Sequence, residues 1–309
     1  MNTPLTTAFS IPMNKQPPSP PAPVTDNVLV RMNTQQRQSA GLQRKEARLP
    51  DGSQCVYLEG GQGEPLMLLH GFGSNKDHFC RVARALQGRY RLVIPDLVGF
   101  GESTRSRERS HAPPQQAARL VALAHHLGID HLHVGGSSMG GHIAMTWAAL
   151  YPGMVRSLWL LNPAGVRSAP ASEVRLRNQA SGRNLLITRN AADFKTLMEM
   201  LVDRPVSLPG AMLAALGAER FANADLETQI YGELSDDPLE ARIEGLPTAT
   251  LIVWGQQDRV IHPASAGILR QLLPNAQVRL LDKVGHLPAM EATQRVAEDY
   301  VAFRDQLGQ

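Results

Sequence analysis

The sequence contains few aromatic residues, two cysteines and no long apolar run. Aromatic residues make up 5% of the 309 residues, too few for the base-stacking platforms of proteins that bind single-stranded nucleic acid. Cys55 and Cys80 lack the spacing of a metal motif or a redox pair. No stretch of about 18 apolar residues occurs, so no transmembrane segment is expected. Two unpaired thiols suit a reducing compartment, and we expect a cytoplasmic protein with any membrane association peripheral.

The net charge is small and unevenly distributed. The chain carries +3 in total, of which residues 1–50 contribute +4 from six Lys or Arg and two acidic residues, leaving −1 for the rest. A nearly neutral body lacks the charge of a nucleic-acid-binding domain. The basic stretch at residues 28–48 predicts weak peripheral contact with an anionic membrane surface, while a solvated tail is the simpler interpretation. Both interpretations stay open on the sequence.

The N-terminal segment has the composition of a tail. Residues 1–27 contain seven prolines, which favours an extended chain without a packed core. Residues 1–10 have no positive charge, and prolines interrupt the residues that follow, so a secretory signal peptide is not expected. A short basic helix is predicted within residues 28–46. We assign residues 1–43 to a proline-rich basic tail that includes this short helix.

Apolar runs and helical patterns alternate along most of the remaining chain. The continuous apolar runs at residues 66–70 and 91–95 predict strands buried on both faces. Further strands are predicted at residues 131–134, 155–161, 250–254 and 277–281, and helices at residues 77–86, 113–127, 142–150 and 289–303. Asp51-Gly52 predicts a hairpin turn. The alternation predicts an α/β protein with a mainly parallel sheet flanked by helices, formed by residues 44–165 and 246–309.

One segment departs from the alternation. Residues 166–245 contain helical patterns and no convincing strand, which predicts an all-helical cap inserted between two strands of the sheet. Phe194, Leu197, Met198 and Leu201 fall on one face of a helix. Most of these residues are expected to pack the cap against the body. Met198 is a candidate for the lining of an apolar substrate pocket, because methionine suits adaptable binding surfaces.

The most informative motif is Gly136-Ser137-Ser138-Met139-Gly140, between a predicted strand and a predicted helix. It matches G-x-S-x-G, in which a serine stands on a sharp strand-to-helix turn. The glycines two residues before and after Ser138 let the backbone make that turn without a Cβ clash. The pattern therefore predicts Ser138 as a nucleophile, with its neighbour Ser137 as a substrate-contacting residue.

A serine nucleophile needs a base and an acid that orients the base. Asp258 directly follows a predicted strand, and His286 lies in the loop after the last predicted strand. Asn162, at the other usual position for the acid, cannot carry the charge, and Asp282 lies too close to the histidine loop. We therefore expect Ser138, Asp258 and His286 to form a catalytic triad. His286 takes the serine proton, and Asp258 holds the imidazole tautomer.

An oxyanion forms when the serine attacks, so backbone donors must already face it. One is expected to be the backbone N–H of Met139, directly after the nucleophile. The second is assigned to the backbone N–H of Phe72, in the loop His70-Gly71-Phe72-Gly73 that follows a predicted strand. This chemistry needs no cofactor. No metal site is expected, because the histidines at positions 125, 126, 131 and 133 have no Cys or Glu at ligand spacing.

Five motifs resemble those of the α/β-hydrolase superfamily, over residues 44–307. They are His70-Gly71-Phe72-Gly73, the run from Pro95 to Ser103, Gly136 to Gly141, Trp254 to Asp258, and Gly285-His286. Within the superfamily the chain is similar to bacterial family V lipases and monoacylglycerol-lipase-type hydrolases, through residues 73–77, 161–165 and 184–188. The resemblance implies the α/β-hydrolase fold with a helical lid. It also implies hydrolysis of acyl esters such as mono- or other acylglycerols, with phospholipid acyl bonds as a second class to be tested.

Two other functions stay open on the sequence. A C–C hydrolase of ring-cleavage products shares the serine, the histidine and the fold, but its family is typified by an aromatic residue directly after the histidine. Leu287 stands there, which favours a lipase-type pocket with Leu287 in contact with substrate. A non-catalytic binding module would have no need of an intact serine, aspartate and histidine. Dehalogenases and epoxide hydrolases need a carboxylate nucleophile, which Ser138 as the elbow residue excludes.

Overall fold

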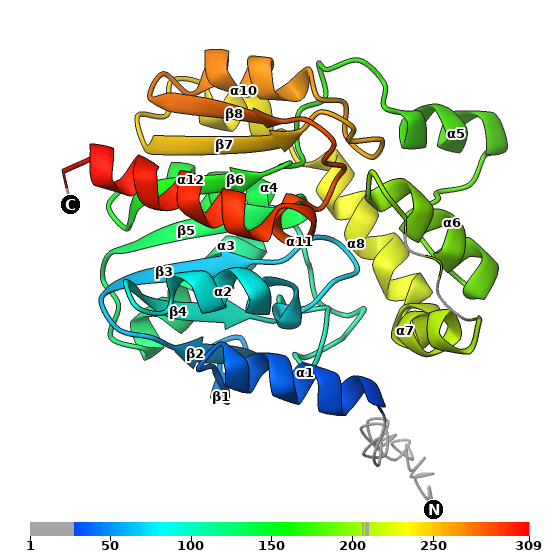
Figure 1. The fold of residues 1–309 in the computed structure, drawn as a ribbon, viewed down its shortest axis with the longest axis horizontal. Helices are drawn as coiled ribbons and strands as arrows, with labels where there is room; N and C mark the ends of the chain where they lie inside the picture. Colours follow the sequence, from blue (N-terminus) through cyan, green and yellow to red (C-terminus); the bar gives the residue numbers. More distant parts are fainter. Residues whose placement is uncertain (1–27, 206, 208–209, 309) are drawn as a thin grey trace, which may run out of the picture.

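An eight-stranded sheet forms the centre of the computed structural model, which describes residues 28–205, 207 and 210–308 (Figure 1). The strands lie in the order β1-β2-β4-β3-β5-β6-β7-β8. β2 pairs antiparallel with β1 and β4, while the other neighbours run parallel. The strands are β1 (Gln43–Arg48), β2 (Gln54–Gly60), β3 (Glu64–Leu69), β4 (Tyr90–Pro95), β5 (Leu132–Ser137), β6 (Val155–Leu161), β7 (Ala249–Gly255) and β8 (Ala276–Leu281). The tail predicted at residues 1–27 lies outside the described residues.

Helices cover both faces of this sheet. The helices that flank it and the N-terminal helix are α1 (Val28–Ser39), α2 (Cys80–Leu86), α3 (Pro113–His126), α4 (Met139–Leu150), α10 (Ser265–Leu272), α11 (Pro288–Glu291) and α12 (Thr293–Gln306), with a 3-10 helix, η1, at Lys76–Phe79. α3, α4 and α10 pack on one face, and α2 and α12 on the other. The predicted α/β class with a mostly parallel sheet is confirmed. None of the helices formed by the described residues has the length and hydropathy needed to cross a membrane.

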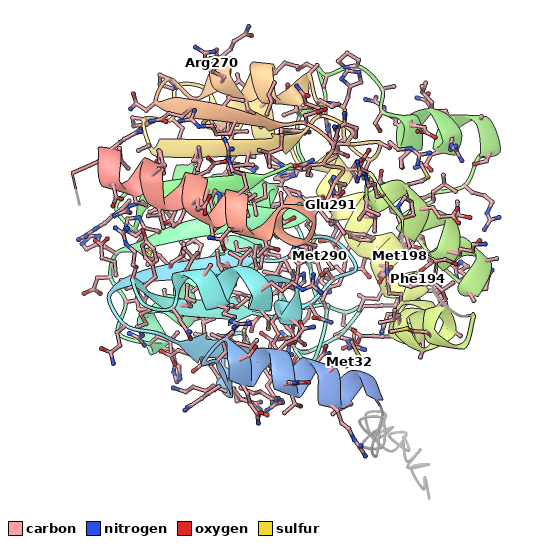
Figure 2. The ribbon with its side chains drawn as sticks, in the orientation of Figure 1. Met32, Phe194, Met198, Arg270, Met290 and Glu291 are labelled. Carbon is pink, nitrogen blue, oxygen red and sulfur yellow. The ribbon has the colours of Figure 1, made fainter. Side chains whose placement is uncertain are left out.

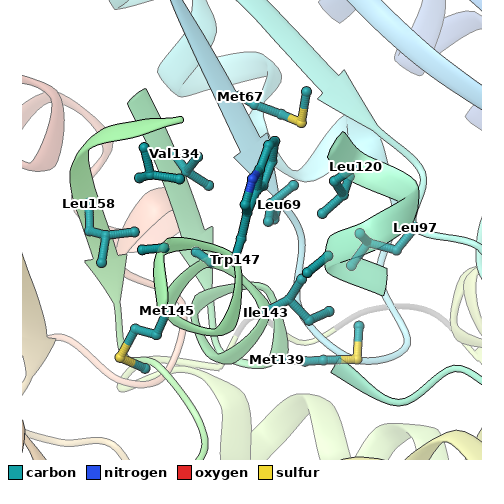
Figure 3. Packing of buried hydrophobic residues seen from close by; sticks show 14 of the residues in the cluster. Met67, Leu69, Leu97, Leu120, Val134, Met139, Ile143, Met145, Trp147 and Leu158 are labelled. Atoms are coloured by element: carbon teal, nitrogen blue, oxygen red, sulfur yellow. The ribbon is translucent and has the colours of Figure 1, made fainter. Parts of the chain in front are cut away.

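Side chains of the central strands alternate between two apolar cores. In β3, Leu66 and Leu68 enter the core under α2 and α12, whereas Met67 and Leu69 enter the core under α3 and α4. Successive side chains of a strand point to opposite faces, so a sheet covered on both sides needs apolar residues at every position. Figure 3 shows the second core, where Trp147 of α4 packs near Met67 and Leu69. The continuous apolar runs in the sequence follow from this arrangement.

Between β6 and β7 the described residues form helices and no strand. These helices are α5 (Glu173–Ser181), α6 (Ala191–Leu201), α7 (Gly210–Ala222), α8 (Ala224–Asp236) and α9 (Leu239–Ile243). Polar caps start two of them. The Ser172 side chain accepts a hydrogen bond from the backbone N–H of Arg175, and the Asn190 side chain accepts from those of Ala192 and Asp193. In Figure 1, α5 to α8 gather beyond one end of the strands, and we call α5–α9 the helical insertion.

Three predicted helices are shortened, divided or partly replaced by a 3-10 turn in the structure. The basic helix predicted at residues 28–46 ends at Ser39, because the residues that follow it pair with β2 as strand β1. The helix predicted at residues 77–86 starts with the 3-10 turn η1 before α2 begins. The closing helix predicted at residues 289–303 is two helices, because Ala292 leaves the helical region with φ −134° and ψ 41°. Strand pairing and local turns thus override these helical patterns.

Asp51 ties the hairpin between β1 and β2 to α3. Its carboxylate accepts hydrogen bonds from the backbone N–H and the hydroxyl of Ser53 at 2.9 and 2.5 Å, and from Arg119 Nε at 2.7 Å. Partial burial raises the pKa of Asp51, but these hydrogen bonds outweigh the burial and hold the pKa at about 2. The charged carboxylate therefore stabilises the folded chain.

We expect Asp51→Asn to lower the thermal unfolding temperature by about 2 °C near neutral pH, the effect of a partly exposed ion pair in a chain of this size. In the unfolded chain an aspartate titrates near ~3.9, above its pKa in the fold. The contribution of Asp51 is therefore present above about pH 4 and is lost as the pH falls towards about 2. Thermal unfolding of both proteins at pH ~7, ~5 and ~3 measures it. A difference that stays constant over this range would contradict the assignment.

Candidate active site

Ser138 lies at the turn between β5 and α4, in a backbone conformation that few side chains adopt. Its φ of 53° and ψ of −117° place it at positive φ, where the Cβ atom is crowded by the backbone. Hydrogen bonds hold the turn: the backbone N–H of Ser138 donates to Leu161 O at 3.0 Å, and its carbonyl accepts from Ala164 N–H at 2.9 Å. The side chain is partly exposed and lines a cavity.

Close backbone contacts require the two glycines of the motif. A Cβ atom on Gly136 would overlap the backbone of Gly140, and a Cβ atom on Gly140 would overlap the backbone of Leu69 and His70. Neither neighbour is the end of a flexible side chain, so a change of rotamer cannot make room for a larger residue. The spacing of the glycines around Ser138 thus follows from the packing of this turn.

His286 and Asp258 are buried and lie next to each other. His286 Nδ1 and Asp258 Oδ2 are 2.9 Å apart, and the residues are 3% and 6% exposed. Asp258 Oδ1 accepts the backbone N–H groups of Val260 and Ile261 at 2.8 and 3.0 Å. A carboxylate that accepts from Nδ1–H leaves His286 Nε2 as the free nitrogen of a neutral imidazole. Among the described residues no hydrogen bond joins the Ser138 hydroxyl to His286.

Asn162 is a second buried partner of Asp258. Its Nδ2 donates to Asp258 Oδ2 at 2.6 Å and to the Gly285 carbonyl at 3.2 Å, and its Oδ1 accepts from Gly255 N–H at 3.1 Å. It is fully buried and has a φ of 43°, a left-handed conformation that asparagine adopts more readily than most residues. The sequence suggested this position only as an alternative place for the acid. The structure instead shows its amide joining the strand end, the carboxylate and the histidine loop.

Glu291 fixes the loop that carries His286. Its carboxylate on α11 accepts the backbone N–H groups of Gly285 and Leu287, on either side of the histidine, at 3.0 and 3.1 Å. It also accepts the backbone N–H of Asp203, from the segment after α6, at 2.8 Å. The backbone N–H of His286 donates to the last carbonyl of α6 at 2.8 Å. The histidine loop is therefore attached to the helical insertion as well as to α11, where Figure 2 labels Glu291.

The loop after β3 lies against Ser138 and includes Phe72. A Cβ atom on Gly71 would lie 3.3 Å from Ser138 Cβ, so the two segments are in direct contact. His70 shapes this loop: its Nδ1 lies 2.8 Å from Gly71 O, and the backbone N–H of Leu97 donates to its Nε2 at 3.0 Å. Burial lowers the pKa of His70 and favours the neutral ring with its proton on Nδ1. His70 is therefore structural, and it supports the loop of the predicted oxyanion donor.

Ser138 opens into a cavity of about 540 Å³, within the size range of sites that hold small organic ligands. Apolar lining residues include Phe72, Ala164 and Ile261 from the body and Leu186, Tyr231 and Leu234 from the helical insertion. Arg167, Arg175 and Asp236 line it as well and are exposed, so they mark its opening. The cavity thus lies between the body and the helical insertion, with apolar and buried polar residues in its walls and charged residues at its mouth.

The residues predicted to contact substrate lie elsewhere. Ser137 is buried on β5, Leu287 immediately precedes α11, and Met198 lies on α6, where Figure 2 labels it. None of the three lines the cavity. Ser137 is next to Ser138 in the sequence, but successive residues of a strand point to opposite faces of the sheet. Ser137 therefore does not share the cavity with Ser138. Met139, the other predicted oxyanion donor, is the first residue of α4.

A second buried histidine–aspartate pair lies in the cavity wall. His142 Nε2 and Asp237 Oδ2 are 2.7 Å apart, and Arg242 donates to both oxygens of Asp237 at 2.6 and 2.8 Å. Burial raises the pKa of Asp237, but these hydrogen bonds outweigh it and hold the pKa at about 2. Within the part of the chain that the structure describes, no cluster of three or more His, Cys, Asp or Glu could hold a metal ion. Sequence reasoning missed the pair, whose members are 95 residues apart and belong to no shared motif.

Known proteins share this sequence pattern. The family model for the α/β hydrolase fold matches residues 64–293. Lipase 1 of Psychrobacter immobilis is 38% identical over 275 residues, which cover 87% of this chain and 86% of the lipase. The monoacylglycerol lipase ABHD6 of Bos taurus is 28% identical over 281 residues, which cover 86% of this chain and 83% of that enzyme.

A solved structure shares the fold. The crystal structure of a membrane phospholipase A, described as a bacterial virulence factor, aligns with a TM-score of 0.86 at 35% identity, over 91% of this chain and 92% of that one. The family match runs from β3 to the first residue of α12, and so spans Ser138, Asp258 and His286. The chain therefore belongs to the α/β-hydrolase fold family.

Proposed function

We propose that this protein is a serine carboxylic ester hydrolase, a lipase or esterase, with Ser138 as nucleophile, His286 as base and Asp258 as the acid that orients the base. One observation carries the proposal: Ser138 is held at positive φ at a strand-to-helix turn and lines a cavity whose wall is partly apolar. Strain of this kind persists at functional sites, where it exposes a reactive group. The relatives named lipase and monoacylglycerol lipase support the same activity.

Attack begins at the ester carbonyl. His286 Nε2 takes the proton of the Ser138 hydroxyl as Oγ bonds to the carbonyl carbon, which gives a tetrahedral intermediate and an imidazolium. Asp258 stabilises the imidazolium through its 2.9 Å contact with Nδ1. The backbone N–H groups of Met139 and Phe72 meet the negative charge on the former carbonyl oxygen. Each such donor contributes about 3 kcal/mol in the transition state.

The tetrahedral intermediate then collapses. The C–O bond to the alcohol breaks as the imidazolium returns its proton to the leaving oxygen, and the acyl group stays on Ser138 as an ester. A water molecule gives a proton to His286 and attacks the acyl carbon. A second collapse releases the carboxylic acid and returns the proton to Ser138. Each proton transfer uses His286 Nε2, so the proposed cycle needs no cofactor.

The cavity supports an acyl ester as substrate. The apolar part of its wall suits an acyl chain, because burial of each CH₂ group contributes about 0.8 kcal/mol. Arg167, Arg175 and Asp236 at its mouth offer hydrogen-bond partners for the hydroxyl groups of a glycerol leaving group. We therefore assign mono- or other acylglycerols as the substrate class, with phospholipid acyl bonds as a second class.

A C–C hydrolase and a non-catalytic binding module are the competing functions. Both would keep the same fold, so fold alone does not separate them from an ester hydrolase. Leu287 stands where C–C hydrolases are typified by an aromatic residue, which supports the ester hydrolase. A binding module would gain nothing from holding Ser138 in a strained conformation beside a buried histidine–aspartate pair.

Weak peripheral contact with anionic membranes through α1 is part of the proposal. Val30 and Met32 on this helix are 48% and 41% exposed. Part of the basic charge nearby is already paired with the body: Arg37 with Asp77 at 2.6 Å, and Lys45 with an acidic residue of β2 at 2.8 Å. Paired cations attract anionic lipid less strongly, so the contact is weak and salt-sensitive. A cytoplasmic location belongs to the same proposal and is supported by two buried free cysteines.

Hydrolysis of p-nitrophenyl esters from C2 to C16 tests the proposed activity. We expect Ser138→Ala to lower kcat/KM by roughly 10⁵-fold, because the nucleophile and base act as a unit. A medium- or long-chain optimum in the wild type would identify a lipase, and a short-chain optimum an esterase. Full activity in the variant would refute the serine mechanism. A folded wild type without turnover at any chain length would favour one of the competing functions. Turnover of a dienoate ring-cleavage product would then indicate the C–C hydrolase, and no turnover the binding module.

Asn162→Gly tests the support of Asp258. Glycine adopts the left-handed conformation of this position, so the variant removes the amide without straining the backbone. We expect kcat/KM to fall about tenfold, the value of one hydrogen bond to a buried charge. Lys283→Gly is the matched control, since Lys283 is also left-handed, with φ 58°, but is exposed. Equal kinetics for Asn162→Gly, Lys283→Gly and the wild type would mean that the amide does not support the acid.

Sedimentation with lipid vesicles tests the membrane contact. We expect the protein to sediment with vesicles containing phosphatidylserine, less with phosphatidylcholine alone, and less again as salt is raised to about 0.5 M. Met32→Glu should abolish the binding, because it places a like charge against the lipid. Leu307→Glu, at a residue with 39% exposure at the other end of the chain, is the matched control. Equal sedimentation of all three proteins would rule out contact through α1.

A further inference from the structure

Arg220 on α7 is a buried cation that the proposed reaction does not use. It is 8% exposed, and its Cζ lies 5.7 Å from the centroid of the Phe72 ring. A cation over an aromatic face is attracted by the ring quadrupole, and more strongly where water is excluded. A Cβ atom on Gly73, which has φ +65°, would overlap the same guanidinium. Arg220 therefore fills the space directly against the loop of the proposed oxyanion donor.

Residues of the helical insertion hold this guanidinium in place. Nε and Nη2 donate to Glu227 of α8 at 3.1 and 2.9 Å, and Nη2 also donates to Leu186 O at 2.6 Å. Glu227 is 3% exposed; its burial raises its pKa, and the hydrogen bonds from Arg220 oppose this rise. Moving either charge away would leave the other buried and unpaired, which is strongly unfavourable. The helical insertion thus sets the position of the guanidinium by hydrogen bonds. The guanidinium in turn packs against the Phe72 loop of the body.

The ring of Phe72 is packed between the body and the helical insertion. It meets Phe100 of the body and Tyr231 of α8 edge to face, with centroid distances of 5.7 and 5.9 Å. Arg220 adds a second contact from the helical insertion. The backbone N–H that belongs to this ring is the proposed second oxyanion donor. Such a donor acts fully only when it is held within about 0.5 Å of its place.

We propose that Arg220 is a positioning residue, which sets the Phe72 backbone N–H by packing its guanidinium against Phe72 and Gly73. This inference rests on the proposed function, because it requires the N–H of Phe72 to bind the oxyanion. It couples the helical insertion to the chemistry. When α7 moves away from the body, the guanidinium leaves the loop and the loop relaxes. The oxyanion hole is therefore complete only while α7 is seated on the body.

The neighbouring residue of α7 offers a matched control. Glu219 forms an ion pair with Arg105 of the body at 2.7 Å, and its side chain is 47% exposed. This pair also joins α7 to the body, but it does so at the loop after β4 and not at the Phe72 loop. Loss of Glu219 therefore removes an attachment of α7 while Arg220 and its partners stay in place.

Kinetics and boronic acid inhibition test the proposal in Arg220→Met, Arg220→Lys and Glu219→Gln. An alkylboronic acid forms a tetrahedral adduct with a serine nucleophile, so its inhibition constant reports oxyanion binding apart from substrate binding. We expect Arg220→Met to lower kcat about 10- to 100-fold, part of the loss from deleting one donor, with KM changed less than about twofold and the inhibition constant raised in parallel. Arg220→Lys keeps the charge but not the planar fork, so an intermediate loss is expected. Glu219→Gln should match the wild type.

A double-mutant cycle locates the effect. Phe72→Leu keeps the backbone N–H and removes the ring that Arg220 contacts. The double variant should therefore lose less activation free energy, measured from kcat, than the sum of the losses in Phe72→Leu and Arg220→Met. Additive losses, or a variant that is less stable but keeps its kcat, would overturn the proposal. If Arg220→Met does not fold, Arg220→Lys carries the same comparison. A wild type that neither hydrolyses esters nor binds the boronic acid would overturn the proposed function as well, whereas an active wild type with an unaffected Arg220→Met overturns this inference alone.

Discussion

The backbone turn at Ser138 is the constraint on which the rest of the site depends. A serine at φ 53° persists only where its surroundings allow no other conformation, and here the backbones of Gly136 and Gly140 are too close for any side chain. The start of α4 also packs directly against the end of β3, since a Cβ atom on Gly140 would overlap Leu69. The loop that follows β3 is thereby placed beside Ser138, where an oxyanion would form.

Buried and partly buried polar side chains hold the other loops of the site in register with that turn. Asn162 joins the end of β7 to Asp258, and Glu291 gathers the backbone N–H groups on both sides of His286. The helical insertion takes part in this support, since the last carbonyl of α6 accepts from His286 N–H and Arg220 packs on the Phe72 loop. The helical insertion therefore forms a cavity wall and also restrains two loops that the proposed mechanism uses.

Local sequence patterns were enough to locate the central strands and the turn at Ser138, because burial on both faces and close backbone packing leave direct marks on the residue types. The contacts that support the loops of the site leave no such mark on the sequence. Arg220 packs on the Phe72 loop and Glu291 binds the backbone of Asp203, contacts between segments far apart in the sequence, and neither residue belongs to a motif that was identified. The cavity that Ser138 lines is likewise not marked in the sequence, and Ser137, Leu287 and Met198 do not line it. Which side chains face a cavity between two packed units depends on tertiary contacts that periodicity does not encode.

Covalent labelling by a fluorophosphonate, read by intact-protein and peptide mass spectrometry, tests the central claim most directly. The reagent reacts with a serine only where a base and an oxyanion site activate it. We predict one adduct per chain, on Ser138, and labelling slowed by about 10³-fold or more in His286→Ala. A folded wild-type protein that stays unlabelled, or that carries the label on a different serine, would contradict the assignment of Ser138 as an activated nucleophile.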